Sequence, residues 1–451
     1  METAINKNIF RLYDIRGVAY KDLTSDAVNI IGKAYGTYMK SMGYSAITVG
    51  RDNRASSSDF FSNLSEGIMS TGCNVTNLGV VTTPLLYYSL FHLKPDGGVM
   101  ITGSHNPPEY NGMKICVNQS AIFGAEIQKI RKICEDNDFH HGIGKLEDAD
   151  VVTPYRKMLL QKFHFRKKIK VVIDAGNGTA GLVVPRLFEK LECDLVPLFC
   201  EPDCRFPNHH PDPTVPENLE ALINKVKEVK ADVGIAFDGD ADRIGVVDNR
   251  GNILWGDKLL ILYARDLLKN HPGASIIFEV KCSQTLSDDI KKNGGKPIMC
   301  AAGHSIIKGR MKKEKALLAG EMSGHMFFAD EYFGYDDAIY AACRIIRILS
   351  NSDLSLSELL KDLPITFSTP EIRVDCPDEK KFDVVKKIAS DLKKNYKTID
   401  IDGARVIFEH GWGLVRASNT QPVLVLRFEA NSPAHLDFIQ NTITSKVKEY
   451  L

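Results

Sequence analysis

The chain has 451 residues, which is too long for one hydrophobic core and predicts three or four domains. The chain has 57 Lys and Arg residues and 57 Asp and Glu residues, so their charges cancel. It therefore lacks the excess of positive charge that would indicate a nucleic acid or an anionic membrane as partner. No apolar stretch has the length of a membrane span, the start lacks a signal-peptide core, and ten scattered cysteines without a Cys-x-x-Cys pair indicate reduced thiols. We expect a cytoplasmic multidomain enzyme, a monomer or weak homo-oligomer, that binds no nucleic acid and no membrane.

The first unit, residues 1–149, alternates strands with helices. Apolar runs at residues 46–50 and 74–78 predict strands, and the amphipathic stretch at 27–35 predicts a helix. This alternation is typical of an α/β domain. The charged stretch at 135–150 is predicted to be a solvated connection that ends the unit.

A loop rich in turn-forming residues follows the next strand. The apolar residues 98–101 predict a buried strand, and Thr-Gly-Ser-His-Asn-Pro follows at residues 102–107. Ligands of open α/β sheets bind at the carboxyl ends of the strands, which is where Ser104 is expected to lie. Ser, Asn and Gly also favour turns for local reasons, so this loop alone leaves a reactive serine and a simple turn equally open.

The second unit, residues 150–253, begins with a predicted strand at 170–175 and a glycine-rich turn at 176–181. The turn fits Gly-x-Gly-x-x-Gly, with Glu201 about twenty residues later, as in dinucleotide-binding sites. Glycines with this spacing also allow close packing of a strand on a helix. A dinucleotide-dependent oxidoreductase is therefore one alternative.

Three aspartates at alternate positions follow the predicted strand at 231–237. Asp238, Asp240 and Asp242 are separated by small residues and can converge on one hard cation. An EF-hand is excluded because Arg243 occupies its sixth position, where glycine is required. Three carboxylates so close together repel one another unless a cation neutralises them, which favours Mg²⁺ over a merely acidic turn.

Two further polar loops lie in the third unit, residues 254–366, and the fourth, residues 367–451. In the loop at 320–325, Glu321 and Ser323 can hydrogen-bond vicinal sugar hydroxyls. In Arg-Ala-Ser-Asn-Thr at 416–420, the guanidinium with its polar neighbours can hold a phosphate, although a simple polar hairpin explains it equally well.

The third unit is predicted to be α/β. The fourth differs, because a strand at 371–374, a helix at 380–394, a strand meander at 404–430 and a helix from 434 predict an α+β module.

Together and in this order, the four loops resemble those of the α-D-phosphohexomutase superfamily, most closely its bacterial phosphomannomutase/phosphoglucomutase branch. Gly103 stands where many relatives carry Ala and Ala241 where many carry Gly, and both exchanges are expected to be neutral. The resemblance implies four domains around a central cleft, three related α/β domains with mixed sheets and a smaller C-terminal α+β domain.

The resemblance also implies an isomerase that interconverts the 1- and 6-phosphates of mannose and/or glucose. A phosphoserine at Ser104 and a hexose 1,6-bisphosphate, both intermediate and activator, would carry the phosphoryl group. Mg²⁺ would bind Asp238, Asp240 and Asp242 together with Ser104. The expected partners are small sugar phosphates. The implied catalytic residues are Ser104, His105, Lys114, Arg16, Arg243 and His325. The implied substrate-binding residues are Tyr13, Lys281, His304, Glu321, Ser323, Arg416, Ser418, Asn419 and Thr420.

Two further alternatives stay open. Met322 resembles the mannose/glucose branch, whereas phosphoglucosamine mutases more often carry Gln there, so a phosphoglucosamine mutase is less favoured. A metal-dependent sugar-phosphate phosphatase would use the same serine and aspartates to release phosphate to water. We also expect a hinge near residues 364–370 that lets the fourth domain open and reclose.

Overall fold

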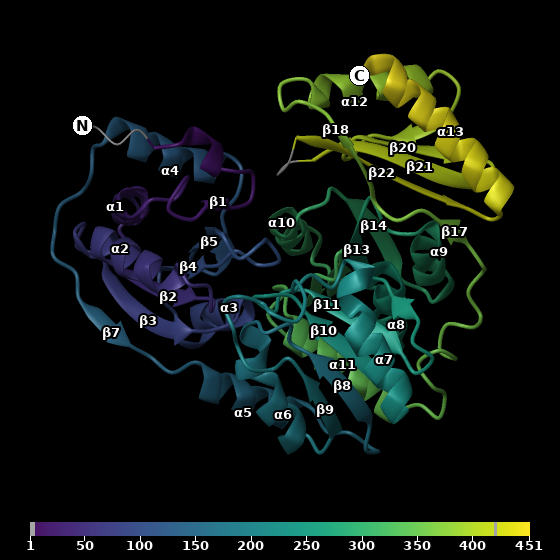
Figure 1. The fold of residues 1–451 in the computed structure, drawn as a ribbon, viewed down its shortest axis with the longest axis horizontal. Helices are drawn as coiled ribbons and strands as arrows, with labels where there is room; N and C mark the ends of the chain where they lie inside the picture. The colour runs from purple at the N-terminus through teal and green to yellow at the C-terminus, as the bar shows by residue number, and fades with distance from the viewer. Residues whose placement is uncertain (1–4, 419–421) are drawn as a thin grey trace.

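Four β-sheets follow one another along the chain, each with its own helices, in the computed structural model, which describes residues 5–418 and 422–451. In Figure 1 the first domain lies on the left, the second below, the third at the centre and the fourth at the upper right. The predicted fold, three related α/β domains and a smaller C-terminal α+β domain, is confirmed. No helix in the described part of the chain is long and apolar enough to cross a membrane. All ten cysteines are free thiols, as predicted.

The first sheet has the strand order β1-β5-β4-β2-β3-β7, with β6 paired to β5. The predicted connection at 135–150 is partly wrong, because β7 lies within it and pairs in parallel with β3. All three residues of β7 are exposed, so no apolar alternation revealed the strand. The elements are β1 (Ile15–Val18), α1 (Ser25–Ser41), β2 (Ala46–Arg51), α2 (Ser57–Met69), β3 (Asn74–Val80), α3 (Thr83–His92), β4 (Gly97–Ile101), β5 (Tyr110–Val117), β6 (Ser120–Ala121), α4 (Ala125–Asp136) and β7 (Leu146–Asp148).

The second and third domains continue the α/β pattern with shorter sheets. The second contains α5 (Val152–Lys162), β8 (Lys170–Asp174), η2 (Thr179–Leu182), α6 (Val184–Lys190), β9 (Asp194–Leu198), α7 (Glu220–Val229), β10 (Val233–Phe237), β11 (Ile244–Asp248) and β12 (Ile253–Leu254). The third contains α8 (Gly256–Asn270), β13 (Ser275–Glu279), α9 (Gln284–Lys292), β14 (Lys296–Cys300), α10 (His304–Glu314), β15 (Leu318–Gly320), β16 (Met326–Phe328) and α11 (Ala338–Ser350).

The first three sheets share one strand order. Each contains four consecutive strands, of which the first lies between the second and the third and is parallel to both. The fourth is antiparallel and pairs with the outer side of the third. The strand orders are β5-β4-β2-β3, β11-β10-β8-β9 and β16-β15-β13-β14. The parallel strands require helical crossovers, whereas the antiparallel strand follows its neighbour after a short loop. Each domain therefore presents one such loop at the carboxyl end of a buried strand.

The fourth domain is a sheet covered on one face by two helices. Alternate residues of its strands face opposite sides, so Val415 lies in the domain's own core while Trp412 and Leu414 face the third domain. A small apolar cluster of Val280, Trp412 and Leu414 joins the two domains. The elements are β17 (Phe367–Ser368), β18 (Ile372–Asp375), α12 (Lys381–Leu392), β19 (Lys397–Ile399), β20 (Ala404–Phe408), β21 (Gly411–Ala417), β22 (Val423–Ala430) and α13 (Pro433–Tyr450).

Candidate active site

The first three of the four predicted loops occupy equivalent places in their domains. Residues 102–109 join β4 to β5, residues 238–243 join β10 to β11, and residues 321–325 join β15 to β16. The fourth lies between β21 and β22. Each of the first three follows a strand whose residues are all buried, so each begins at the edge of a core that fixes its position.

Ser104 is held in an unusual conformation beside the aspartates. Its φ is 50°, in the left-handed region, which costs a non-glycine residue about 1–2 kcal/mol. Its backbone N–H donates to Thr102 Oγ1 at 2.8 Å, and its Oγ donates to Asp238 Oδ2 at 2.9 Å. The Nδ1 atom of His105 lies 3.1 Å from Oγ. Burial, reinforced by Arg243 and Arg16, lowers the pKa of His105 well below its ordinary value, which favours the neutral ring over the charged one.

A buried arginine that the sequence did not single out holds the serine loop in place. The guanidinium of Arg54 donates hydrogen bonds to four carbonyl oxygens of one short segment. They belong to Ser104 (2.8 Å), Asn106 (2.6 Å), Tyr110 (3.0 Å) and Pro107. Burial lowers the pKa of Arg54, and Asp52 opposes this. Asp52 accepts from Arg54 Nε at 3.2 Å and from the Gly103 N–H at 3.0 Å.

Gly103 has no room for a side chain, which corrects the expectation that an exchange to Ala is neutral. A Cβ at this position would lie 2.4 Å from Cζ of Arg54 and 2.8 Å from the carbonyl oxygen of Tyr110. Since that guanidinium is fixed by its carbonyl partners, it cannot move aside without breaking hydrogen bonds. The glycine is therefore matched to the buried arginine.

The three aspartates form a buried group that fits a divalent cation. One oxygen from each of Asp238, Asp240 and Asp242 lies within 4.8 Å of the others, and Oδ1 of Asp240 and Oδ1 of Asp242 are buried without a hydrogen-bond partner among the described residues. Burial and then the charges of the other two carboxylates raise the pKa of Asp238 well above its ordinary value. Buried oxygens without donors and mutually repelling charges are what a hard cation relieves, so these residues fit a metal.

Lys114 on β5 reaches the same carboxylates from the first domain. Its Nζ donates to Asp240 Oδ2 at 2.9 Å and to Asp242. Burial lowers its pKa, but the two carboxylates outweigh burial and raise the pKa above the ordinary lysine value. Lys114 is therefore a fixed positive charge beside Ser104.

A histidine pair on the third domain completes this network. Nε of Arg243 donates to His325 Nε2 at 3.1 Å, which leaves the ring proton on Nδ1. That Nδ1 lies 3.1 Å from Oδ2 of Asp336, a fully buried carboxylate outside the predicted set. His304 stacks on His325 with ring centroids 5.5 Å apart, and burial followed by Lys308 lowers the pKa of His304 well below its ordinary value.

An aromatic residue, Tyr13, and a cationic residue, Arg16, lie near the serine loop in the first domain. The hydroxyl of Tyr13 donates to the carbonyl of Ala302 at 2.9 Å, so the first domain touches the third here. Arg16 donates to Asp14 Oδ2 at 2.5 Å and to Asn106 Oδ1 at 3.3 Å, while its buried Nε has no hydrogen-bond partner. Arg16 therefore has a donor available beside Ser104.

The other predicted residues lie where the third and fourth domains meet. Lys281 Nζ donates to Glu371 Oε2 at 3.2 Å, and Glu321 Oε1 accepts from the Gly303 N–H at 2.7 Å. Arg416 Nε donates to Asp402 Oδ2 at 2.9 Å. Ser323 lies in the turn after Glu321, and Ser418 is buried at the end of β21. Asn419 and Thr420 lie outside the described residues. The described contacts thus bring Ser104, the aspartates, Lys114 and His325 together, and the pair of Lys281 and Glu371 joins the third domain to the fourth.

The glycine-rich turn at 176–181 serves packing. A Cβ on Gly178 would lie 2.8 Å from the carbonyl oxygen of Gly239, and one on Gly181 would lie 1.8 Å from that of Cys200. The turn leads into the short 3-10 helix η2 rather than into an α-helix whose N-terminus could bind a pyrophosphate. The dinucleotide alternative therefore loses its support.

Family models of phosphoglucomutase/phosphomannomutase match almost the whole chain. The alpha/beta/alpha domain I matches residues 7–141, domain II 153–251, domain III 255–367 and the C-terminal domain 371–446. The chain belongs to the phosphoglucomutase/phosphomannomutase family. The predicted superfamily and bacterial branch are confirmed.

Relatives of this family span the chain. A phosphomannomutase/phosphoglucomutase of Pseudomonas putida is 47% identical over 447 residues, 98% of this chain and 96% of the relative. A phosphoglucomutase of Neisseria gonorrhoeae is 43% identical over 450 residues, 99% and 98% of the two chains. A crystal structure of a phosphoglucomutase/phosphomannomutase family protein from Burkholderia thailandensis superimposes with a TM-score of 0.93 at 40% identity, covering 99% and 98%. All three share the full four-domain length with this chain.

Proposed function

We propose that this chain is an isomerase that interconverts the 1-phosphate and the 6-phosphate of a hexose, mannose or glucose, through a phosphoserine at Ser104. One observation carries the proposal: Oγ of Ser104, on a loop fixed by buried hydrogen bonds, lies 2.9 Å from a carboxylate of the aspartate group and 3.1 Å from a neutral imidazole. The names of the family's matched relatives, which include phosphomannomutase/phosphoglucomutase and phosphoglucomutase, support the substrate class.

The proposed reaction has two transfers. In the first, the phosphorus–oxygen bond to Ser104 breaks and a bond to the free sugar hydroxyl forms, which yields a hexose 1,6-bisphosphate and a serine hydroxyl. The proton leaves the sugar hydroxyl, and a proton returns to Oγ. The bisphosphate then turns end for end, and Ser104 accepts the other phosphoryl group. The serine ester survives in water between transfers, so the phosphoryl group is conserved.

Several side chains support these transfers by position and charge. His105 Nδ1 is placed to exchange a proton with Ser104 Oγ. Lys114, Arg243 and Arg16 supply fixed positive charge around a phosphoryl group at Ser104. Asp238, Asp240 and Asp242 would hold Mg²⁺ together with the phosphate on Ser104. The ion would neutralise charge on the phosphoryl oxygens.

The remaining predicted residues are proposed to hold the sugar phosphate. Glu321 has one carboxylate oxygen bound to the Gly303 N–H, so its other oxygen is placed to accept from sugar hydroxyls, with Ser323 beside it. Arg416 with Ser418, Asn419 and Thr420 would hold the phosphate that is not being transferred. Tyr13, Lys281 and His304 would line the space between these groups.

An intact-mass measurement tests the proposal directly. The protein is expected to carry one phosphoryl group, to lose it on incubation with excess mannose 1-phosphate or glucose 1-phosphate, and to form the 6-phosphate as followed by ³¹P NMR. Ser104→Ala should abolish the phosphorylation and the interconversion, whereas Ser58→Ala, at an exposed serine on α2, should change neither. Near-full interconversion by Ser104→Ala would contradict the phosphoserine role. Release of inorganic phosphate at the turnover rate would favour the phosphatase instead, and preferred turnover of glucosamine phosphates would favour the phosphoglucosamine mutase.

A further inference from the structure

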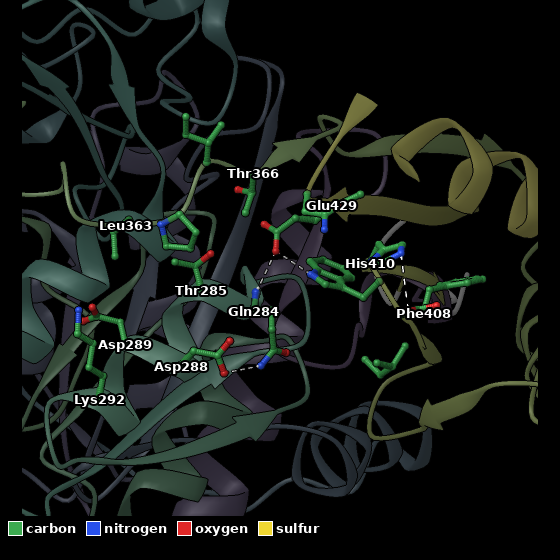
Figure 2. A pocket seen from close by; sticks show the side chains of 18 of the residues that line it. Gln284, Thr285, Asp288, Asp289, Lys292, Leu363, Thr366, Phe408, His410 and Glu429 are labelled. Carbon is green, nitrogen blue, oxygen red and sulfur yellow. Dashed lines mark hydrogen bonds and ion pairs between the residues drawn. The ribbon is translucent and has the colours of Figure 1, made fainter. Parts of the chain in front are cut away.

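A cavity lies where the third and fourth domains meet. Its volume is about 420 Å³, and it is lined by α9, by the linker around residues 362–366 and by the turn between β20 and β21. Figure 2 shows the side chains of these segments facing one another across it. None of the predicted site residues within the described chain lines this cavity. It is therefore separate from the place proposed for the sugar phosphate.

We call this cavity between α9, the linker and the β20–β21 turn the hinge pocket. Its wall is mainly apolar. Leu363, Ile365, Phe408 and Trp412 all line it. The ring of Trp412 is fixed, because the guanidinium of Arg405 lies 3.6 Å from its centroid. Such a surface buries the hydrocarbon body of a small molecule rather than a sugar.

One buried carboxylate opens into this apolar space. Glu429 is 4% exposed, and its Oε1 accepts from Trp412 Nε1 at 2.9 Å and from the Gln284 N–H at 3.1 Å. Its Oε2 receives no hydrogen bond from the part of the chain that the structure describes. In Figure 2 the carboxylate oxygen without a dashed line points away from these donors, toward Thr366. A carboxylate oxygen that faces an apolar cavity without a donor from the described chain is a site for a cation that brings its own N–H groups.

Two of the other carboxylates around the pocket are paired, and the remaining ones add to its negative charge. Arg265 donates to Asp289 Oδ2 and to Asp362 Oδ2, both at 2.9 Å, so those two carboxylates are already paired. Asp288 accepts from the side chain of Gln284 at 3.0 Å. Lys292 also lines the pocket, and its Nζ lies 3.6 Å from Oδ2 of Asp362. Glu409 also lines the pocket, and Arg405, stacked on Trp412, offsets part of the charge of Glu429. The lining carboxylates outnumber Lys292, so the pocket as a whole favours a cation over an anion.

We propose that the hinge pocket binds a small organic ammonium ion with an apolar body, the ammonium group on Glu429 and the body against Trp412 and the linker at 363–366. Because the walls belong to two domains, an occupant fixes the angle between them.

The pocket also adjoins the contact that carries Lys281. There Arg405 donates to the carbonyls of Val280 and Cys282, and Arg427 donates to that of Lys281. An occupant is thus expected to slow a reaction that needs the fourth domain to move. This second point rests on the proposed mutase function.

Fluorescence of Trp412 tests the binding without any turnover. The chain has two tryptophans, so Trp255→Phe leaves Trp412 as the single reporter. The probe is 2-phenylethylammonium chloride, compared with the uncharged 2-phenylethanol and the anionic 3-phenylpropionate. We expect a saturable change centred at about 1 mM for a ligand of this size with the ammonium probe, and a response at least about tenfold weaker with the other two.

Two variants distinguish the pocket from chance binding. Glu429→Gln keeps an acceptor for Trp412 and Gln284 but removes the charge, and should weaken the ammonium probe about tenfold. Thr366→Tyr fills the cavity from the linker and should abolish the response. A missing saturable response, or one that Glu429→Gln leaves unchanged, would overturn the site. A saturable response with undiminished turnover of mannose 1-phosphate would overturn the coupling to the fourth domain. Because binding is read without substrate, failure of the site and failure of the mutase function are distinguishable.

Discussion

Replacing Arg54 by Lys tests whether the buried guanidinium sets the geometry of the reactive serine. The substitution keeps the positive charge and removes the planar fork. Arg54 serves four carbonyl oxygens and Asp52 at once. An ammonium group has three N–H donors, so if one remains on Asp52, two of the four carbonyls lose their donor.

The size of the effect follows from those two carbonyls. Loss of the donor costs about 1–3 kcal/mol at the buried carbonyl of Ser104 and less at the other three, which belong to half-buried or exposed residues, so the native loop conformation is destabilised by about 1–3 kcal/mol. The loop already holds Ser104 at a left-handed φ of 50°, and relaxation of that strain would move Oγ away from Asp238. A misplacement of about 1 Å at a reacting atom lowers kcat by about 10²-fold.

The assay is the steady-state interconversion of mannose 1- and 6-phosphate, with kcat and KM measured separately. We expect kcat to fall and KM to change little, because the loop that is proposed to hold the distal phosphate lies in another domain. Arg51→Lys is the matched control: Arg51 lies on the same segment and donates to Asn77 Oδ1 at 3.2 Å, away from the serine loop. An unchanged kcat for Arg54→Lys, in a protein that unfolds at the wild-type urea concentration, would refute the proposed role.

Three further predictions concern other parts of the molecule. Chelation with EDTA should abolish interconversion and added Mg²⁺ should restore it; activity that survives exhaustive chelation would exclude the metal. Asp336→Asn removes the carboxylate that faces Nδ1 of His325 at 3.1 Å, and should lower kcat by about 10²-fold with little change in KM; a pure rise in KM would assign Asp336 to substrate binding instead. Burial raises the pKa of Asp337 to about 6 despite hydrogen bonds from Tyr340, Tyr332 and Tyr155. The carboxyl group thus favours the folded state most below about pH 4, and this contribution, about 3 kcal/mol, is lost as the pH rises through 6. The free energy of unfolding of Asp337→Asn, measured with urea, should not show this fall between about pH 4 and 6. Profiles of unfolding free energy against pH that run parallel for variant and wild type would contradict the prediction.

The order of elements was predictable where a strand of the α/β domains is buried on both faces and is followed by residues that break it. Residues 98–101 and 233–237 are continuous apolar runs, and both lead into polar loops at the places where the structure has them. β7 was not predictable, since its three residues are all exposed and show no apolar alternation.

The residues that support the site were harder to find than the loops. Arg54 lies 50 residues before Ser104, and Asp336 lies 11 residues after His325, so neither shares a local pattern with its partner. The signal for Arg54 was its position just after the buried strand β2, next to Asp52. Contacts between domains, such as Arg405 on the carbonyl of Cys282, leave no trace in hydrophobic periodicity, because they join separately folded cores.

The repeated strand order of the first three domains has a consequence for how such a protein changes over generations. In each domain the scaffold strands are shared and the hairpin that leaves the third strand carries one of the predicted loops. A substitution in one of these loops leaves the other two domains unaltered, so the segment proposed to recognise the sugar can change independently of the one proposed to take up the phosphoryl group.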